Sequence, residues 1–349
     1  MLVMEAGRRG KQKAAPTLHD VARQAGVSVA TASRALNGSS TRTVRPEYIS
    51  RVVAAAERLG YQPHLSAQAI ALGSTPTAAL VVSDIDDPYF SSIASGVIVA
   101  AQAHALIPTV AVADRSPARE LQIVRTLRGQ RPRVIIVAGS RIDGAGTDTT
   151  LDDELQAYQA VGGRVVMVSQ ESLRFPTVAI DNAGGGRQLA SALVSRGYRR
   201  FAVLSAARKI RTSRDRCDGF LAGLREAGMP EPLVVETRFT RDGGYEATRR
   251  LLDGGPPTVD AIVTVNDVMA IGAMTAIRDA GFTPGRDVGV AGFDDISWCA
   301  DLDPALTTVA IPLHQVGVMA MELALGDDPQ QPVIRVPTSV ILRDSTPSR

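Results

Sequence analysis

Residues 17–37 have the sequence TLHDVARQAGVSVATASRALN, and this stretch decides the fold of the first part of the chain. Thr17 and Asp20 have the spacing of a capping box, in which a hydroxyl and an acid three residues later cap the start of a helix. Gly26 can adopt the positive φ that ends this helix, and Ser28 can then cap a second helix. The stretch therefore predicts a helix-turn-helix.

The second of these helices is the element that enters the major groove of DNA in proteins with a helix-turn-helix. Its first residues face base edges, and here these are Val29, Ala30 and Arg34. Many helical hairpins with a capped start and a glycine turn never contact nucleic acid. The pattern alone therefore leaves both DNA binding and a purely structural hairpin open.

A third helix is predicted within residues 44–61, because Pro46 suits a first helical turn and Gly60 suits a helix end. It would close a small core with the first two helices. Its expected core stripe is Ile49, Val52, Val53, Ala56 and Leu59.

The charge of the chain is distributed unevenly. Residues 1–75 hold ten Lys or Arg against four Asp or Glu, whereas the rest of the chain holds 28 against 32. A local basic excess favours a polyanionic partner through counterion release, and the acidic remainder gains nothing from phosphate. We therefore expect the contact with nucleic acid to lie in the N-terminal part.

Cysteine content and hydropathy give an expectation about location. Cys217 and Cys299 cannot form a disulfide framework, and no Cys/His cluster has metal-ligand spacing. No stretch approaches the roughly 20 apolar residues that span a bilayer, and the first residues lack the apolar region of a signal peptide. We expect a cytoplasmic, nucleoid-associated protein without membrane contact. Residues 1–16 are expected to form a disordered basic tail.

From Thr77 onward, short apolar runs alternate with helical patterns. One series runs from AALVVS to RVVMVS, and a second runs from FAVLS to VGVAGF. Strands that alternate with helices indicate a parallel sheet, and two such series predict two doubly wound α/β halves. Ligands of such sheets bind outside the carboxyl ends of the strands, so polar and aromatic residues that follow strands are candidate site residues.

No motif in the sequence indicates an enzyme. The G-x-G-x-x-G, GxxxxGK[ST] and G-x-S-x-G patterns are missing after the predicted strands, and the four histidines are scattered. We therefore expect no catalytic residues, no cofactor and no metal. A small-molecule binder of the transport type is the alternative, and the basic N-terminal module argues against it.

The chain resembles LacI/GalR transcriptional repressors. The first stretch and the VRPEYISRVVAAAERLGYQP that follows are similar to the family's DNA-binding headpiece, and galactose-repressor-like members resemble it most. The resemblance implies a helix-turn-helix headpiece and a periplasmic-binding-protein-like effector domain with two lobes. It continues through DPYF (87–90), DNAGGG (181–186), NDVMAIGA (266–273), GFDD (292–295), LTTV (306–309) and LRDST (342–346).

This resemblance implies a headpiece at residues 17–62, a hinge at 63–76, and an effector-binding and dimerisation domain at 77–349. A single headpiece covers few base pairs, so we expect a homodimer on a palindromic operator. Its activity would be controlled by a small-molecule effector, a sugar or a nucleoside-like ligand.

The residues expected to contact DNA lie in the headpiece and the hinge. Ile70 has the position of the family's apolar wedge, which opens a base step in the minor groove. His64 replaces the usual Asn, and this leaves the cap of the hinge helix in doubt. The predicted set is Thr17, Ser28, Val29, Ala30, Thr31, Arg34, Asn37 and Ile70.

The resemblance also implies an effector site between the two lobes. Aromatic rings there can stack on a sugar or a base, while Arg, Asn and Asp side chains supply donors and acceptors. Asn and Asp after strands can also be turn residues, and the aromatic residues can be ordinary core. The predicted set is Tyr89, Phe90, Ser169, Thr212, Arg216, Phe239, Asn266 and Asp294.

One departure from the family affects the expected ligand. The family usually has an Asp-Arg pair after the strand RVVMV, whereas this chain has Ser169 and Gln170. The cleft therefore loses a charged acceptor that sugar repressors often use on hydroxyls. A plain hexose becomes less certain as the effector, and a different effector, or none, remains open.

Overall fold

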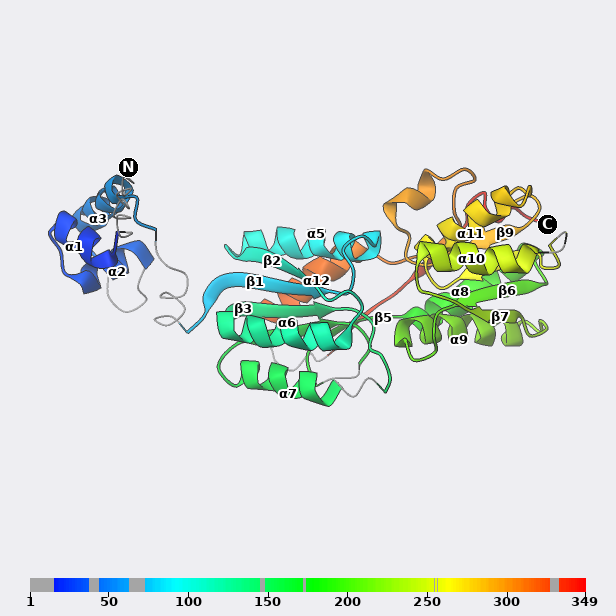
Figure 1. Cartoon of the computed structure of the whole chain (residues 1–349), viewed down its shortest axis with the longest axis horizontal. Coiled ribbons are helices and arrows are strands. Elements are labelled where there is room, and N and C mark those ends of the chain that lie inside the picture. Colours follow the sequence, from blue (N-terminus) through cyan, green and yellow to red (C-terminus); the bar gives the residue numbers. More distant parts are fainter. Residues whose placement is uncertain are drawn as a thin grey trace, which may run out of the picture. The chain divides into compact units, whose positions relative to one another are not determined.

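A computed structural model of the chain describes residues 16–37, 44–62, 73–144, 148–171, 174–253, 255, 257–326 and 333–349. Contacts divide the chain into two compact units, Met1–Leu72 and Gly73–Arg349 (Figure 1).

The first unit contains the predicted helix-turn-helix. Its helices are α1 (Leu18–Ala25), α2 (Val29–Asn37) and α3 (Pro46–Leu59). The capping box between Thr17 and Asp20 is present, and Gly26 ends α1 with a φ of 65°. The side-chain oxygen of Ser28 accepts a hydrogen bond from the amide of Thr31 at 3.1 Å, which caps α2. The sequence prediction of both helix starts is confirmed.

The core face of α3 differs in part from the predicted stripe. Val52 and Ala56 are buried as expected, but Ile49 and Val53 are 38% and 39% exposed, and Ala55 is buried in their place. The core of three short helices is narrow. Ile49 and Val53 lie at one edge of the α3 face that meets α1 and α2, so the core does not cover them.

The second unit has two lobes, each built on a parallel sheet. The first lobe has six strands in the order β11-β5-β4-β3-β1-β2. Its elements are β1 (Thr75–Val82), α5 (Pro88–Ala103), β2 (Ile107–Val112), α6 (Pro117–Gln130), β3 (Pro132–Ala138), α7 (Asp148–Gln159), β4 (Arg164–Val168), β5 (Thr177–Ile180), α12 (Leu313–Leu325) and β11 (Val333–Val336).

The second lobe has four strands in the order β7-β6-β8-β9. A separate antiparallel pair, β10 (Thr308–Ala310) and β12 (Ser339–Ile341), lies near the passage between the lobes. The other elements are α8 (Asn182–Ser195), β6 (Phe201–Ser205), α9 (Arg211–Glu226), β7 (Leu233–Glu236), α10 (Arg241–Leu252), β8 (Ala261–Thr264), α11 (Asp267–Asp279), β9 (Gly289–Ala291) and the 3₁₀ helix η1 (Ser297–Ala300).

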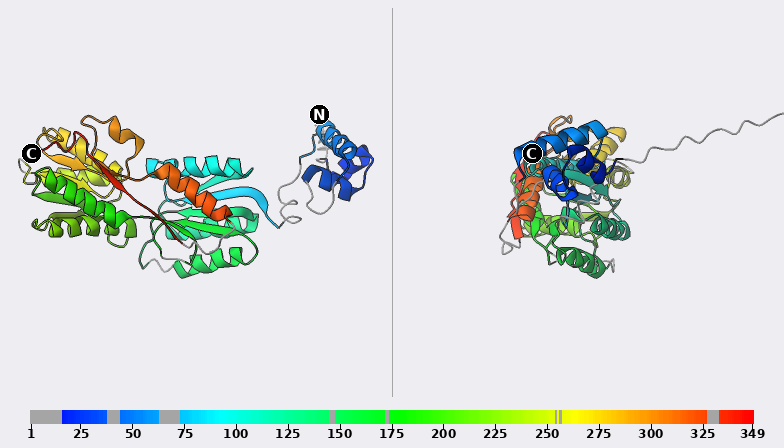
Figure 2. Two further views of the ribbon diagram at one scale, coloured as in Figure 1. Left: turned by 180° about the vertical axis from the view of Figure 1, so that it is seen from behind. Right: turned by 90° about the vertical axis from the view of Figure 1, so that its left-hand side faces the viewer.

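The chain passes between the lobes three times, after β5, after β10 and after β11. Its C-terminal part therefore returns to the first lobe, where α12 packs along α5 and β11 pairs with β5 (Figure 2). The two predicted α/β halves are confirmed, but they are not simply consecutive. The strand β1 also includes Thr75 and Pro76, which the sequence analysis assigned to the hinge.

Glycine allows the close packing of α12 against α5. A Cβ atom on Gly96 would lie 1.9 Å from the carbonyl oxygen of His314, and one on Gly317 would lie 2.1 Å from that of Ile93. Neither distance is compatible with a side chain, because backbone atoms of the facing helix cannot move away independently. The two glycines therefore fix how closely the returning helix approaches the first lobe.

Candidate functional site

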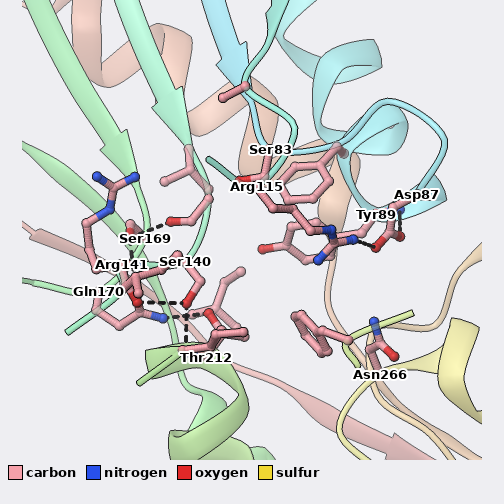
Figure 3. Close-up of a pocket in the computed structure, with 18 of the residues that line it drawn as sticks. Ser83, Asp87, Tyr89, Arg115, Ser140, Arg141, Ser169, Gln170, Thr212 and Asn266 are labelled. Carbon is pink, nitrogen blue, oxygen red and sulfur yellow. Dashed lines mark hydrogen bonds and ion pairs between the residues drawn. The ribbon is translucent and has the colours of Figure 1, made fainter. Parts of the chain in front are cut away.

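A cavity lies between the two lobes of the second unit, at the carboxyl ends of their strands (Figure 3). It encloses about 970 Å³ of space, part of which is open to solvent. All eight residues of the predicted effector set line it: Tyr89, Phe90 and Ser169 from the first lobe, and Thr212, Arg216, Phe239, Asn266 and Asp294 from the second.

Arg216 lies at the base of the cavity and is only 3% exposed. Its Nε donates to Oδ1 of Asn182 at 2.8 Å, and a terminal nitrogen donates to the carbonyl oxygen of Val265 at 2.8 Å. Its other terminal nitrogen lies 2.8 Å from Oδ1 of Asp294, and the guanidinium carbon is 4.0 Å from the Phe293 ring centroid. The sequence suggested a guanidinium free for a ligand, but most of this group holds the protein together.

Asp294 combines burial with an unusual backbone conformation. Its φ is 125°, a value that side-chain-bearing residues rarely adopt, and the following Asp295 has a φ of 56°. The backbone is held in this turn because the amide of Asp294 donates to Val309 at 2.8 Å and its carbonyl oxygen accepts from Ile311 at 3.3 Å. Burial raises the pKa of Asp294 well above its usual value, although the nearby Arg216 opposes this shift.

Three aromatic rings line the cavity. The rings of Tyr89 and Phe90 meet edge to face with their centroids 4.9 Å apart. Phe239, from the opposite lobe, has the guanidinium of Arg115 at 5.3 Å from its ring centroid, a cation–π contact that spans the cleft. Tyr89 and Arg115 are labelled in Figure 3 among the residues that line the cavity. These rings provide flat apolar surfaces in a cavity that aliphatic and charged side chains also line.

Asn266 has two roles in the structure. Its Oδ1 accepts a hydrogen bond from the amide of Met269 at 3.1 Å and so caps α11. Its Nδ2 has no hydrogen-bond acceptor among the described residues, and the residue lines the cavity. The turn role and the site role that the sequence left open are therefore compatible, because they use different atoms of the amide.

Two further ion pairs, which no sequence pattern indicated, line this cavity. Arg141 and Glu120 form a buried bidentate pair with distances of 2.7 and 2.9 Å. Arg115 contacts Asp87 at 3.2 Å, and Asp87 also accepts from the amide of Tyr89 and caps α5. The cavity is therefore lined by three arginines and three carboxylates, and each arginine is paired with a carboxylate.

The predicted DNA-contacting residues of the headpiece differ in their exposure and in their contacts. Ala30 is exposed, but Val29 is half-buried and packs against the headpiece core. The hydroxyls of Ser28 and Thr31 lie 2.8 Å apart and share a hydrogen bond. Arg34 is partly exposed on the same helix.

The other three predicted DNA contacts are Thr17, Asn37 and Ile70, and they stay predictions. Thr17 serves as the cap of α1, where its hydroxyl donates to Asp20 at 2.7 Å. The side chain of Asn37 and the whole of Ile70 lie outside the described residues. The apolar wedge assigned to Ile70 therefore stays a prediction.

Two kinds of feature are absent from the described part of the chain. None of its helices has the length and apolar character needed to cross a membrane. No group of three or more His, Cys, Asp or Glu side chains there is arranged to hold a metal ion.

A helix-turn-helix module joined to a two-lobed α/β unit with an interlobe cavity defines a class of ligand-controlled transcriptional regulators. Residues 17–64 match the family model described as bacterial regulatory proteins of the lacI family. Residues 190–346 match a periplasmic binding protein-like domain.

Relatives and a solved structure agree with these matches. The chain is 33% identical to the regulator GalS of Salmonella typhimurium over 88% of its length and 89% of that protein. It is 30% identical to the repressor CytR of Escherichia coli K12, with 90% of each chain covered. The structure of a CelR–cellobiose complex matches with a TM-score of 0.68 and 29% identity over 95% of this chain and 99% of that one. The chain belongs to the LacI family of DNA-binding transcriptional regulators, which are not enzymes.

Proposed function

We propose that this protein is a dimeric repressor that binds a palindromic operator and is controlled by a neutral, hydroxyl-bearing ligand in the interlobe cavity. The observation that carries the ligand class is the charge balance of the cavity, in which each of three arginines has a carboxylate partner. The repressor role is supported by the similarity to CytR, and the ligand class by the similarity to the CelR–cellobiose complex.

The paired charges disfavour a phosphorylated or carboxylated ligand. An anion would need an arginine released from its carboxylate, and breaking a buried pair leaves an uncompensated charge. A neutral ligand can instead use the Nδ2 of Asn266 as a donor and the carboxylate of Asp294 as an acceptor. The rings of Tyr89 and Phe239 supply the stacking surfaces that a sugar ring or a nucleoside base requires.

Calorimetry on the full chain tests this ligand class with neutral mono- and disaccharides and nucleosides, each compared with its phosphate. We expect binding only among the neutral compounds. Phe239→Ala should weaken that binding about tenfold or more, because it removes a ring that the ligand would bury. Phe282→Ala, which changes a half-buried ring of the second lobe outside the cavity, is the matched control. Binding of a phosphate in preference to its neutral parent would refute the proposed class.

The dimer is proposed from apolar side chains at the edge of the first lobe. Val99 on α5 and Ile107 and Val110 on the edge strand β2 are 54%, 53% and 41% exposed. Monomeric proteins seldom expose grouped apolar side chains, whereas dimer interfaces bury them. The second lobe shows a similar exposure at Leu233 and Val234 on its own edge strand, β7.

Val110→Asp is expected to convert the dimer to a monomer, because it places a charge among the exposed apolar side chains of the proposed interface. Operator affinity should fall about 100-fold or more, since two linked headpieces bind far more tightly than one. Sedimentation velocity and operator titration measure the two effects. Val161→Asp is the control, since Val161 is 61% exposed after α7 and should tolerate the charge. A Val110→Asp variant that remains dimeric would exclude this surface.

A further inference from the structure

The wall of the interlobe cavity includes a direct connection between the two lobes. The loop after β3 in the first lobe meets the segment before α9 in the second lobe, where Ile142 and Ile210 form an isolated antiparallel bridge. The amide of Asp143 donates to the carbonyl oxygen of Lys209 at 2.8 Å. This connection is separate from the three places where the chain itself passes between the lobes.

Side-chain charges reinforce this connection. Oδ1 of Asp143 lies 2.5 Å from Nε of Arg211, and its Oδ2 pairs with Arg214. Hydrogen bonds from these two arginines hold the pKa of Asp143 below its usual value, so its carboxylate is charged near neutral pH. Arg211 and Arg214 lie in the first turn of α9, while Asp143 belongs to the other lobe. We call Asp143, Arg211, Arg214 and the Ile142–Ile210 bridge the clasp.

Neutral groups extend the same connection into the cavity. The amide of Thr212 donates to Oγ of Ser140 at 3.0 Å, and Nε2 of Gln170 donates to Oγ1 of Thr212 at 2.7 Å. The dashed lines between these side chains in Figure 3 mark this contact across the cleft. Gln170 is one of the two residues that stand in place of the Asp-Arg pair expected after β4. Its amide forms a hydrogen bond with the hydroxyl of Thr212, which would otherwise be available to a ligand.

All of these bonds join protein atoms of one lobe to protein atoms of the other. Closure of two lobes around a ligand usually depends on the ligand to bridge them. We propose that in this protein the clasp holds the lobes closed without an effector. An effector that enters the cavity or separates the lobes must therefore break the bonds of the clasp.

Hydrogen exchange of the full chain, measured by mass spectrometry without added ligand, tests the clasp and does not require the effector to be known. The amides of Asp143 and Arg211 should be protected in the wild type. In Asp143→Asn their exchange should be about tenfold faster, while the core strand β6 should exchange as in the wild type. Small-angle scattering should show a larger radius of gyration for this variant.

Asp218→Asn is the matched control. Asp218 forms a bidentate pair with Arg208 at 3.0 Å, and both residues belong to the second lobe. Its loss should leave the exchange of the clasp amides unchanged. Salt gives a second measurement on the wild-type chain, because roughly 0.5 M salt shortens the Debye length to about 4 Å and should speed exchange in the clasp.

The proposal is overturned if the clasp amides exchange freely in the wild type, or if neither Asp143→Asn nor salt alters their protection. If Asp143→Asn does not fold, the salt dependence of amide exchange in the wild-type chain tests the proposal by itself. A failure here would leave the proposed ligand class untouched, because that class is tested by binding measurements and not by exchange.

Discussion

Arg216→Ala is expected to lower the free energy of unfolding of the two-lobed unit by about 3 to 5 kcal/mol, the range for breaking a buried ion pair from one side. The substitution leaves the buried carboxylate of Asp294 without its cation. It also removes the donors to Asn182 and to the carbonyl oxygen of Val265. Chemical denaturation followed by circular dichroism measures the change.

Arg208→Ala provides the comparison for this prediction. Arg208 also forms a two-bond pair with an aspartate, but its side chain is 63% exposed, so its loss should cost about 1 kcal/mol or less. Arg216→Ala should also lose its response to a ligand, because the variant is less stable and because it lacks a side chain that lines the cavity. Equal stability of the two variants would show that the buried pair does not hold the second lobe together.

Arg34→Ala is the second substitution with a large expected effect. In the proposed complex Arg34 contacts one guanine edge in each operator arm, and each such contact contributes about 1 to 3 kcal/mol. A dimer loses two contacts, and the preference for one base pair in each arm should relax. Selection from random DNA, combined with operator titration, measures both the affinity and the preferred sequence.

Arg58→Ala is the control for the loss of charge, because Arg58 is an exposed arginine of α3 in the same headpiece. It should weaken binding slightly and evenly across DNA sequences. The exposed Ala30 and the half-buried Val29 offer only apolar contacts, so we expect them to recognise thymine methyl groups. Operator arms whose preferred sequence is unchanged in the Arg34 variant would contradict this account of recognition.

Local sequence patterns predicted the elements that have strong local signals. The capping box at Thr17, the glycine end at Gly26 and most of the long apolar runs correspond to observed element boundaries. The predicted effector residues line one cavity because residues that follow parallel strands meet at the same edge of a sheet. This prediction requires only the local alternation of strands and helices, and it does not require knowledge of contacts between distant residues.

Local sequence signals are weaker for the short elements and for the elements that return to the first lobe. The strand β5 has only four residues, and α8 contains three consecutive glycines, at 184–186, which have low helix propensity. The return of α12 and β11 to the first lobe depends on packing against segments more than 150 residues earlier in the chain. Local periodicity carries no information about such a partner.

The roles of the charged cavity residues were also outside the reach of local patterns. The pair of Arg141 and Glu120 joins residues 21 positions apart, and the contact of Asp143 with Arg211 joins residues 68 positions apart. An arginine looks the same in the sequence whether it is free for a ligand or buried against a carboxylate. Only the folded arrangement distinguishes these two states for Arg216.

The interleaved lobes have a consequence for how the chain folds during synthesis. The first lobe requires α12 and β11, which the ribosome produces only after all of the second lobe except its last segment, which includes β12. While β11 is missing, the strand β5 is an unpaired edge of the first sheet, and the face of α5 that receives α12 is bare. Such exposed surfaces favour aggregation of nascent chains. The headpiece, whose three helices lie within residues 18–59, can fold much earlier than the two-lobed unit.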